Sequence, residues 1–211
     1  MEAENVNVLG SLKLCQAAVQ TSAKMFVLAS SAFSCLSSNS EYYSIYALSK
    51  RHSEEVAQFC CSTHSLPLAI LRPSQIYGNE DNFRRHHPFF YTMVDKAQKG
   101  ANITIYGSND PLRNYIHIDD LKNIIARVVR NKVEGIYSCT YTTDVTCSQI
   151  AKAAFSAFNS KSKVHFLKTK GDISDNVFEK DDSLYKEIGF YPQISIEDGI
   201  KQIAHYRQAL L

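Results

Sequence analysis

The sequence predicts an α/β fold built on a parallel sheet. Two short apolar segments, residues 25–29 and 66–76, have the composition of strands that are buried on both faces. Segments with apolar residues at helical spacing, 6–21 and 46–63, precede each of them. Because helices that alternate with buried strands form right-handed crossovers, this order predicts parallel strands joined by helices.

The first half of the chain supplies this sheet. Its expected elements are helix 6–21, capped by Asn5 or Asn7, strand 25–29, a Ser- and Tyr-rich loop 32–45, helix 46–63, and a strand at 66–76 that is broken at Pro73. The residues expected on the inner sides of the two helices are Val8, Leu12, Cys15 and Val19, then Leu48, Val56, Phe59 and Cys60.

The second half has shorter elements and more polar connections, which predicts a smaller mixed α/β lobe. Its expected elements are a basic loop 79–87, helix 88–99, strands 103–106 and 114–118, a helix capped by Asp119 with the stripe Leu121, Ile124, Ile125 and Val128, strand 135–140, a helix opened by a capping box of Thr146 and Gln149, strand 164–167, and a last helix from Ser195.

Composition excludes several classes of function. Of 211 residues, 45% are hydrophobic and 21% charged, so a disordered or fibrous chain is excluded. A formal charge of +2 gives no reason to expect a nucleic acid or an anionic membrane as partner. Without an apolar stretch of about 18 residues or a signal sequence, we expect a cytoplasmic protein.

The six cysteines are scattered and lack Cys-x-x-Cys pairs, so they are expected to be reduced, buried thiols. Cys60, Cys61 and His64 have a spacing compatible with a metal, but no second ligand cluster accompanies them and no metal site is predicted. The run 84–87, Arg-Arg-His-His, could bind phosphate or could be a solvated loop. No Gly-x-Ser-x-Gly elbow of a hydrolase is present.

Tyr46 and Lys50 are the strongest candidates for chemistry. They lie one turn apart on a predicted helix. A phenol has a pKa of about 10 and acts as a base near neutrality only if its phenolate is stabilised, which an adjacent ammonium does. Ser31, at the carboxyl end of the preceding strand, could hydrogen-bond a substrate oxygen there. The pair alone is weak evidence, since many such pairs lie on solvated helix faces.

Further segments strengthen this interpretation. They are Ser-Ser-Ala at 30–32, Tyr-x-x-x-Lys at 46–50, Leu-Arg-Pro-Ser-Gln-Ile-Tyr-Gly at 71–78 and Arg-Asn-Tyr-Ile-His-Ile-Asp-Asp-Leu at 113–121. With them the chain resembles the extended short-chain dehydrogenase/reductase family, in particular its NAD-dependent nucleotide-sugar epimerases and dehydratases. The resemblance implies that residues 1–78 are the carboxyl-terminal half of a Rossmann-like NAD-binding domain. Residues 79–211 would form the substrate lobe, with some interleaving of the two.

The resemblance also implies roles for individual residues. Tyr46 would be the general base and acid on the sugar hydroxyl, Lys50 would lower its pKa and hold the nicotinamide ribose, and Ser31 would orient the substrate oxygen. Pro73 and Ser74 would lie beside the nicotinamide ring.

Two further residues would contact the substrate. Arg113 would bind its diphosphate, a role suited to a planar cation with several donors. Gln75 stands where the family has an asparagine that touches the sugar, so its contacts are expected to differ.

The departures from the family pattern guide the choice of reaction. Tyr46 follows Ser31 by only fifteen residues, so part of a substrate-side loop is expected to be missing. The Thr-Asp-Glu of dehydratases is absent, which favours an epimerase or a reductase. None of the eight glycines forms the Gly-rich turn that holds the NAD pyrophosphate. At about 30 residues per βαβ unit, some 80–100 residues of the family's fold are not represented, and the chain corresponds to its last two-thirds.

We therefore predict an NAD-dependent 4-epimerase of a nucleotide sugar that works through a transient 4-keto sugar. The alternative is a non-catalytic remnant or partner subunit that keeps the sugar-nucleotide lobe and does not bind NAD alone. NAD is expected to bind the chain weakly. A homodimer is expected through helices 6–21 and 46–63, with Leu12, Val19 and Phe59 as surplus apolar residues. The sequence does not identify the sugar or the base.

Overall fold

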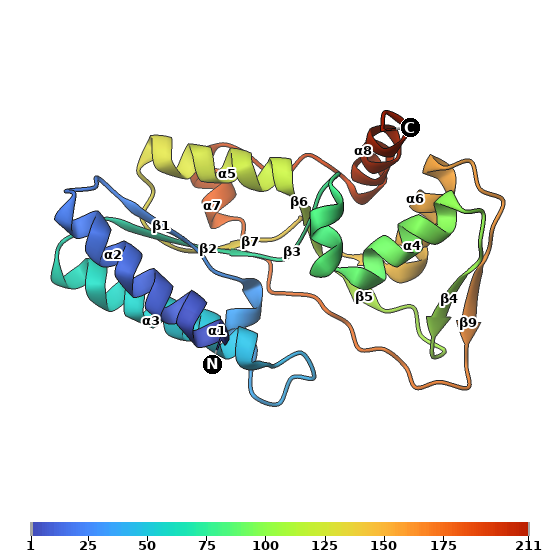
Figure 1. Ribbon diagram of the computed structural model, residues 1–211, viewed down its shortest axis with the longest axis horizontal. Coiled ribbons are helices and arrows are strands. Elements are labelled where there is room, and N and C mark those ends of the chain that lie inside the picture. The colour runs from blue at the N-terminus through green and yellow to red at the C-terminus, as the bar shows by residue number, and fades with distance from the viewer. Residues whose placement is uncertain (1, 211) are drawn as a thin grey trace. The chain divides into compact units, whose positions relative to one another are not determined.

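The chain divides into two units that are interleaved in sequence. A computed structural model describes residues 2–210 (Figure 1). Unit 1 contains the residues up to Ser74, Leu121–Thr140 and Phe178–Tyr191. Unit 2 contains Gln75–Asp120, Tyr141–Val177 and the residues from Pro192 onward.

Unit 1 is built on a three-stranded parallel sheet, as predicted. Its strands, in the order β1-β2-β7, are β1 (Phe26–Ala29), β2 (Leu68–Pro73) and β7 (Gly135–Cys139). Leu28 pairs with Ile70 and Ile70 with Ile136, so the central strand is β2. The α/β fold class is thereby confirmed.

Helices flank this sheet. Figure 1 shows α2 (Gly10–Gln20) and α3 (Ile45–Thr63) along one side, and α5 (Ile118–Asn131) and α7 (Ser183–Ile188) along the other. The core under α2 and α3 consists of Cys15, Leu28, Ala57, Cys60, Cys61, Leu66 and Ile70, with Leu12 and Val19 packed against it. Of the residues predicted for the inner faces, Leu12, Cys15, Val19 and Cys60 therefore belong to this core, whereas Val8, Leu48 and Val56 are not among its members.

The structure corrects three details of this half. The first helix starts earlier than predicted, because α1 (Glu2–Glu4) and a π-helical turn η1 (Asn5–Leu9) run into α2, so neither Asn5 nor Asn7 is its cap. Phe59 does not face the core and is 76% exposed. The loop at 32–45 contains a short 3-10 helix, η2 (Ala32–Cys35).

The predicted strand at 66–76 is two strands in two sheets. Ser74 N donates to Cys139 O in unit 1, whereas Gln75 N donates to Asn114 O in unit 2. β3 (Gln75–Tyr77) then pairs in parallel with β6 (Tyr115–His117). The break after Pro73 is thus the point where the chain leaves one unit for the other.

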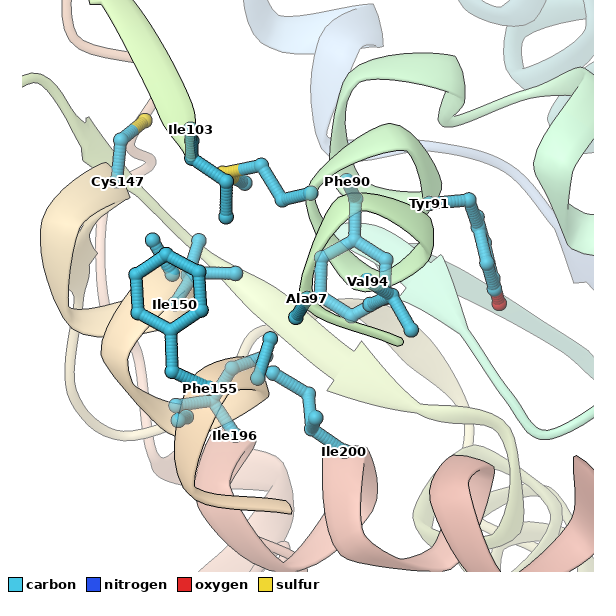
Figure 2. Close-up of a cluster of buried hydrophobic side chains, with 14 of the residues drawn as sticks. Phe90, Tyr91, Val94, Ala97, Ile103, Cys147, Ile150, Phe155, Ile196 and Ile200 are labelled. Carbon is cyan, nitrogen blue, oxygen red and sulfur yellow. The ribbon is translucent and has the colours of Figure 1, made fainter. Parts of the chain in front are cut away.

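Unit 2 has its own core. In Figure 2 it is formed by side chains from α4 (Pro88–Gln98), β4 (Ile103–Tyr106), α6 (Cys147–Ala157) and α8 (Ile196–Gln208). β9 (Val164–Leu167) pairs in parallel with β4, and the antiparallel two-residue strands β5 (Leu112–Arg113) and β8 (Val145–Thr146) were not predicted. A second 3-10 helix, η3 (Asp81–Arg85), occupies the basic loop.

Of the two helix starts predicted in the second half from capping residues, one is confirmed and the other is wrong. Thr146 and Gln149 form the predicted capping box of α6. Asp119 is not a cap, because α5 already begins at Ile118; it lies in the first turn, where a carboxylate still suits the helix dipole. Within residues 2–210 no helix has the length and apolar character to span a bilayer.

Candidate active site

Tyr46 and Lys50 lie on successive turns of α3, at its amino-terminal end. Ser44 caps this end by accepting from Ala47 N. The Lys50 ammonium is 5.9 Å from the centroid of the Tyr46 ring and donates to Ala29 O at 3.0 Å. Burial lowers the pKa of Lys50, and the negative charge of Glu54 partly offsets this. Tyr46 is 46% exposed, so a solvent-accessible phenol stands beside a cation that the end of β1 holds in place.

Ser31 follows β1 and is buried. Its Oγ accepts from Phe33 N at 3.3 Å and so caps η2. The hydroxyl proton is not used in that bond and can be donated elsewhere.

Pro73 ends β2, and Ser74 follows it at the same edge of the sheet. Ser74 is 5% exposed, and its Oγ has no hydrogen-bond partner among the described residues. Since buried hydroxyls are normally satisfied, an unpartnered one at a strand end is unusual. Five of the predicted site residues thus belong to the strand ends and the helix of unit 1.

The other two, Gln75 and Arg113, belong to unit 2. Arg113 is 6% exposed, and its Nη1 donates to Leu112 O at 2.7 Å and to Ser174 O at 2.9 Å. This side of its guanidinium is therefore held by main-chain carbonyls. The Oε1 atom of Gln75 is buried and has no hydrogen-bond partner within the described part of the chain.

Glu54 is a site residue that sequence reasoning missed. It lies one turn after Lys50 on α3, and its side chain is only 3% exposed. Its carboxylate accepts from Ser34 Oγ at 2.7 Å, from Arg72 Nε at 3.0 Å, and also from Ser30. Burial opposes ionisation, but these hydrogen bonds outweigh it and hold the pKa of Glu54 below its usual value. One carboxylate therefore joins α3 to the segments that carry Ser31 and Pro73.

An aromatic cluster beside Tyr46 was also missed. The Phe33 ring packs edge-on against Tyr46, with centroids 6.5 Å apart, and against Phe178, with centroids 5.3 Å apart. Phe178 lies 145 positions from Phe33 in the chain, so no local pattern could predict the contact.

The two remaining candidate groups are each divided between the interior and the surface. Cys61 lies 3.9 Å from Cys15 Sγ in the core, whereas His64 is exposed, so they do not converge on a metal. In the basic run, Arg84 is paired with Asp95, and burial together with His86 lowers the pKa of His87 to about 4. Arg84 is therefore engaged in an ion pair and His87 is partly buried, whereas Arg85 and His86 are exposed.

Comparison with known proteins shows which family and which proteins the chain is similar to. A model of the NAD-dependent epimerase/dehydratase family matches residues 2–140. Among curated proteins, the CDP-abequose synthase of Salmonella typhimurium is 25% identical over 131 residues, which are 62% of this chain and 43% of that protein. GDP-L-fucose synthase 1 of Arabidopsis thaliana is 22% identical over 165 residues, 74% of this chain and 50% of that protein. The chain thus spans about half the length of these curated relatives.

Solved structures share the fold. The UDP-glucose 4-epimerase of Thermotoga maritima, solved with UDP-glucose, superposes with a TM-score of 0.77 at 20% identity, covering 99% of this chain and 71% of that one. The UDP-glucose 4-epimerase of Thermus thermophilus, solved with NAD, gives 0.76 at 21% identity, covering 97% and 70%.

Proposed function

The chain belongs to the NAD-dependent epimerase/dehydratase family, and from that premise we propose that it carries the proton-transfer and substrate-binding parts of a nucleotide-sugar 4-epimerase. The observation that carries the proposal is the accessible Tyr46 phenol with the Lys50 ammonium 5.9 Å from its ring. The Thr-Asp-Glu of dehydratases is absent from the sequence after β1, which favours an epimerase or a reductase over a dehydratase. No finding favours the alternative of a non-catalytic partner subunit.

In this proposal Tyr46 moves the proton. Its phenolate, stabilised by Lys50, takes the proton of the C4 hydroxyl and later returns it to the C4 oxygen. Ser31 donates a hydrogen bond to that oxygen and fixes its distance from Tyr46. Arg113 binds the diphosphate through guanidinium donors other than those that hold Leu112 and Ser174.

The residues present fit the nicotinamide end of NAD, which when bound would take up and return the C4 hydride. The Ser74 hydroxyl is buried without a partner in the described residues, and the Lys50 ammonium has two protons beyond the one given to Ala29. The sequence contains no Gly-rich turn for the pyrophosphate, so we propose that the chain alone holds NAD weakly.

We also propose a homodimer through α2 and α3. Aliphatic and phenyl side chains that these helices and η1 leave exposed are Val6, Leu9, Leu14, Ile45 and Phe59, at 66%, 49%, 62%, 61% and 76%. Leu12 and Val19, expected to contribute, pack against the core instead.

The decisive experiment joins the Gly-rich NAD-binding segment of a family member to this chain and follows sugar epimerisation by NMR. The substitution Tyr46→Phe should lower turnover by orders of magnitude with little effect on substrate binding, because it removes a proton carrier used in the transition state. Tyr43→Phe is the matched control, since that ring contacts Arg51 rather than Lys50. Near-normal turnover of Tyr46→Phe would contradict the proposal.

A further inference from the structure

The aromatic cluster of Phe33, Tyr46 and Phe178 gives the proposed site an apolar wall. Phe33 is two residues after Ser31, and its ring packs against that of Tyr46. Phe178 packs on Phe33 and extends the same apolar surface. Phe33 and Phe178 are both partly exposed, so the wall is accessible to a molecule bound at Tyr46.

The two charged groups that follow Tyr46 along α3 have other partners, although the Lys50 ammonium keeps two protons that the proposed function leaves to the cofactor. The Lys50 ammonium is held by Ala29 O, and the Glu54 carboxylate is turned inward to Arg72, Ser30 and Ser34. A substrate hydroxyl placed against Phe33 would therefore exchange its hydrogen bonds to water for contact with a phenyl ring. Such an unpaired polar group is costly, whereas a methyl group gains from the same contact.

We propose that Phe33 and Phe178 select nucleotide sugars that lack oxygen at C6, so that the methyl group of a 6-deoxyhexose packs on Phe33. This inference rests on the proposed function, because it needs Tyr46 at the C4 oxygen. C5 is bonded to C4, so its substituent is the exocyclic carbon nearest the reacting atoms. A hydroxymethyl group is disfavoured there, and the carboxylate of a hexuronic acid is disfavoured more strongly.

Matched nucleotide sugars test this on the chain itself. The probes are UDP-6-deoxyglucose, UDP-glucose and UDP-glucuronate, together with the corresponding CDP-, dTDP- and GDP-sugars, and binding is followed by ligand-observed NMR. For at least one base, the 6-deoxy sugar should bind about ten-fold more tightly than its 6-hydroxy counterpart. Saturation of the aromatic protons should transfer most strongly to the C6 methyl group.

Variants of Phe33 test whether the apolar wall causes the preference for 6-deoxy sugars. Phe33→Ser should bring the two affinities within about two-fold of each other, whereas Phe33→Leu, which remains apolar and is the safer variant for folding, should keep the preference. Phe166→Ala, an exposed aromatic on β9, is the control and should change neither affinity.

Failure of this inference and failure of the proposed function would give different results. Equal affinities for the 6-deoxy and 6-hydroxy sugars, or a preference that survives Phe33→Ser, would overturn the inference and leave the proposed function standing. Failure of every nucleotide sugar to bind would overturn the proposed function and the inference with it.

Discussion

Replacing Glu54 by glutamine removes the charge from a carboxylate that joins three segments of unit 1. The side chain is 3% exposed and accepts hydrogen bonds from Ser34, Arg72 and Ser30. Removing one partner of a buried ion pair costs about 3–5 kcal/mol, because the other charge is left uncompensated. The Arg72 side chain is 26% exposed and can be partly solvated, so we expect a loss at the lower end, about 3 kcal/mol.

Urea unfolding at pH 7, followed by circular dichroism, measures this loss. For a chain of this size a loss of 3 kcal/mol corresponds to a melting temperature lower by roughly 6–12 °C. Glu55→Gln is the matched control, since Glu55 is the exposed neighbour on the same helix and should shift stability by less than about 0.5 kcal/mol. If Glu54→Gln were as mild as its control, the ion pair would not stabilise the strand ends.

The pH dependence gives a second test of the same residue. The pKa of Glu54 is lower in the folded chain than its usual value, so its contribution is present above the unfolded pKa of about 4.3 and is lost as pH falls through the folded one. The stability difference between the wild type and Glu54→Gln should therefore be constant from pH 6 to 7 and shrink below about pH 4. A difference that stays constant down to pH 3 would show that the charge is not its source.

Three other predictions concern packing, assembly and the cofactor. Gly199→Ala should destabilise unit 2 by about 2 kcal/mol in urea, because an added Cβ would clash with the hydroxyl and ring of Tyr77; wild-type stability would show that Tyr77 moves aside freely. Analytical ultracentrifugation at micromolar concentration should show a dimer that Phe59→Asp converts to a monomer, and a monomeric wild type would contradict the proposed interface. Calorimetric titration should give a dissociation constant for NAD in the millimolar range, about −4 kcal/mol, and a micromolar value would mean that another part of the assembly holds the pyrophosphate.

Much of the fold could be predicted because its signals are local. The strands β1 and β2 come from short apolar runs, and the capping box at Thr146 is a two-residue pattern. The transfer of the chain between units at Ser74 could not be predicted, since it depends on which distant carbonyls accept from two adjacent amides. Exposure of Phe59 was missed for a similar reason, because helical spacing does not say which face a partner helix covers.

In the candidate site, too, the residues with a local signal could be predicted and those defined by long-range contacts could not. Tyr46 and Lys50 could be singled out because their spacing on one helix brings them together, whatever the rest of the chain does. In the sequence, Glu54 has no feature that separates it from an ordinary charged helix residue. Only the structure shows that it is buried and paired with Arg72. The contact between Phe33 and Phe178 depends entirely on tertiary structure.

The direction of α3 explains why these residues gather at one edge of the sheet. β1 and β2 are parallel, so Ser31 and Ser74 both follow carboxyl ends of strands. The crossover between them requires α3 to run back along the sheet, which places its first turns, and not its last, at that edge. Along this helix, positions 46, 50 and 54 form one stripe that passes from an exposed phenol, through a partly buried ammonium, to a buried carboxylate. The buried end is fixed by Arg72, so the residue that anchors α3 to the strand ends also helps to set the position of the exposed Tyr46.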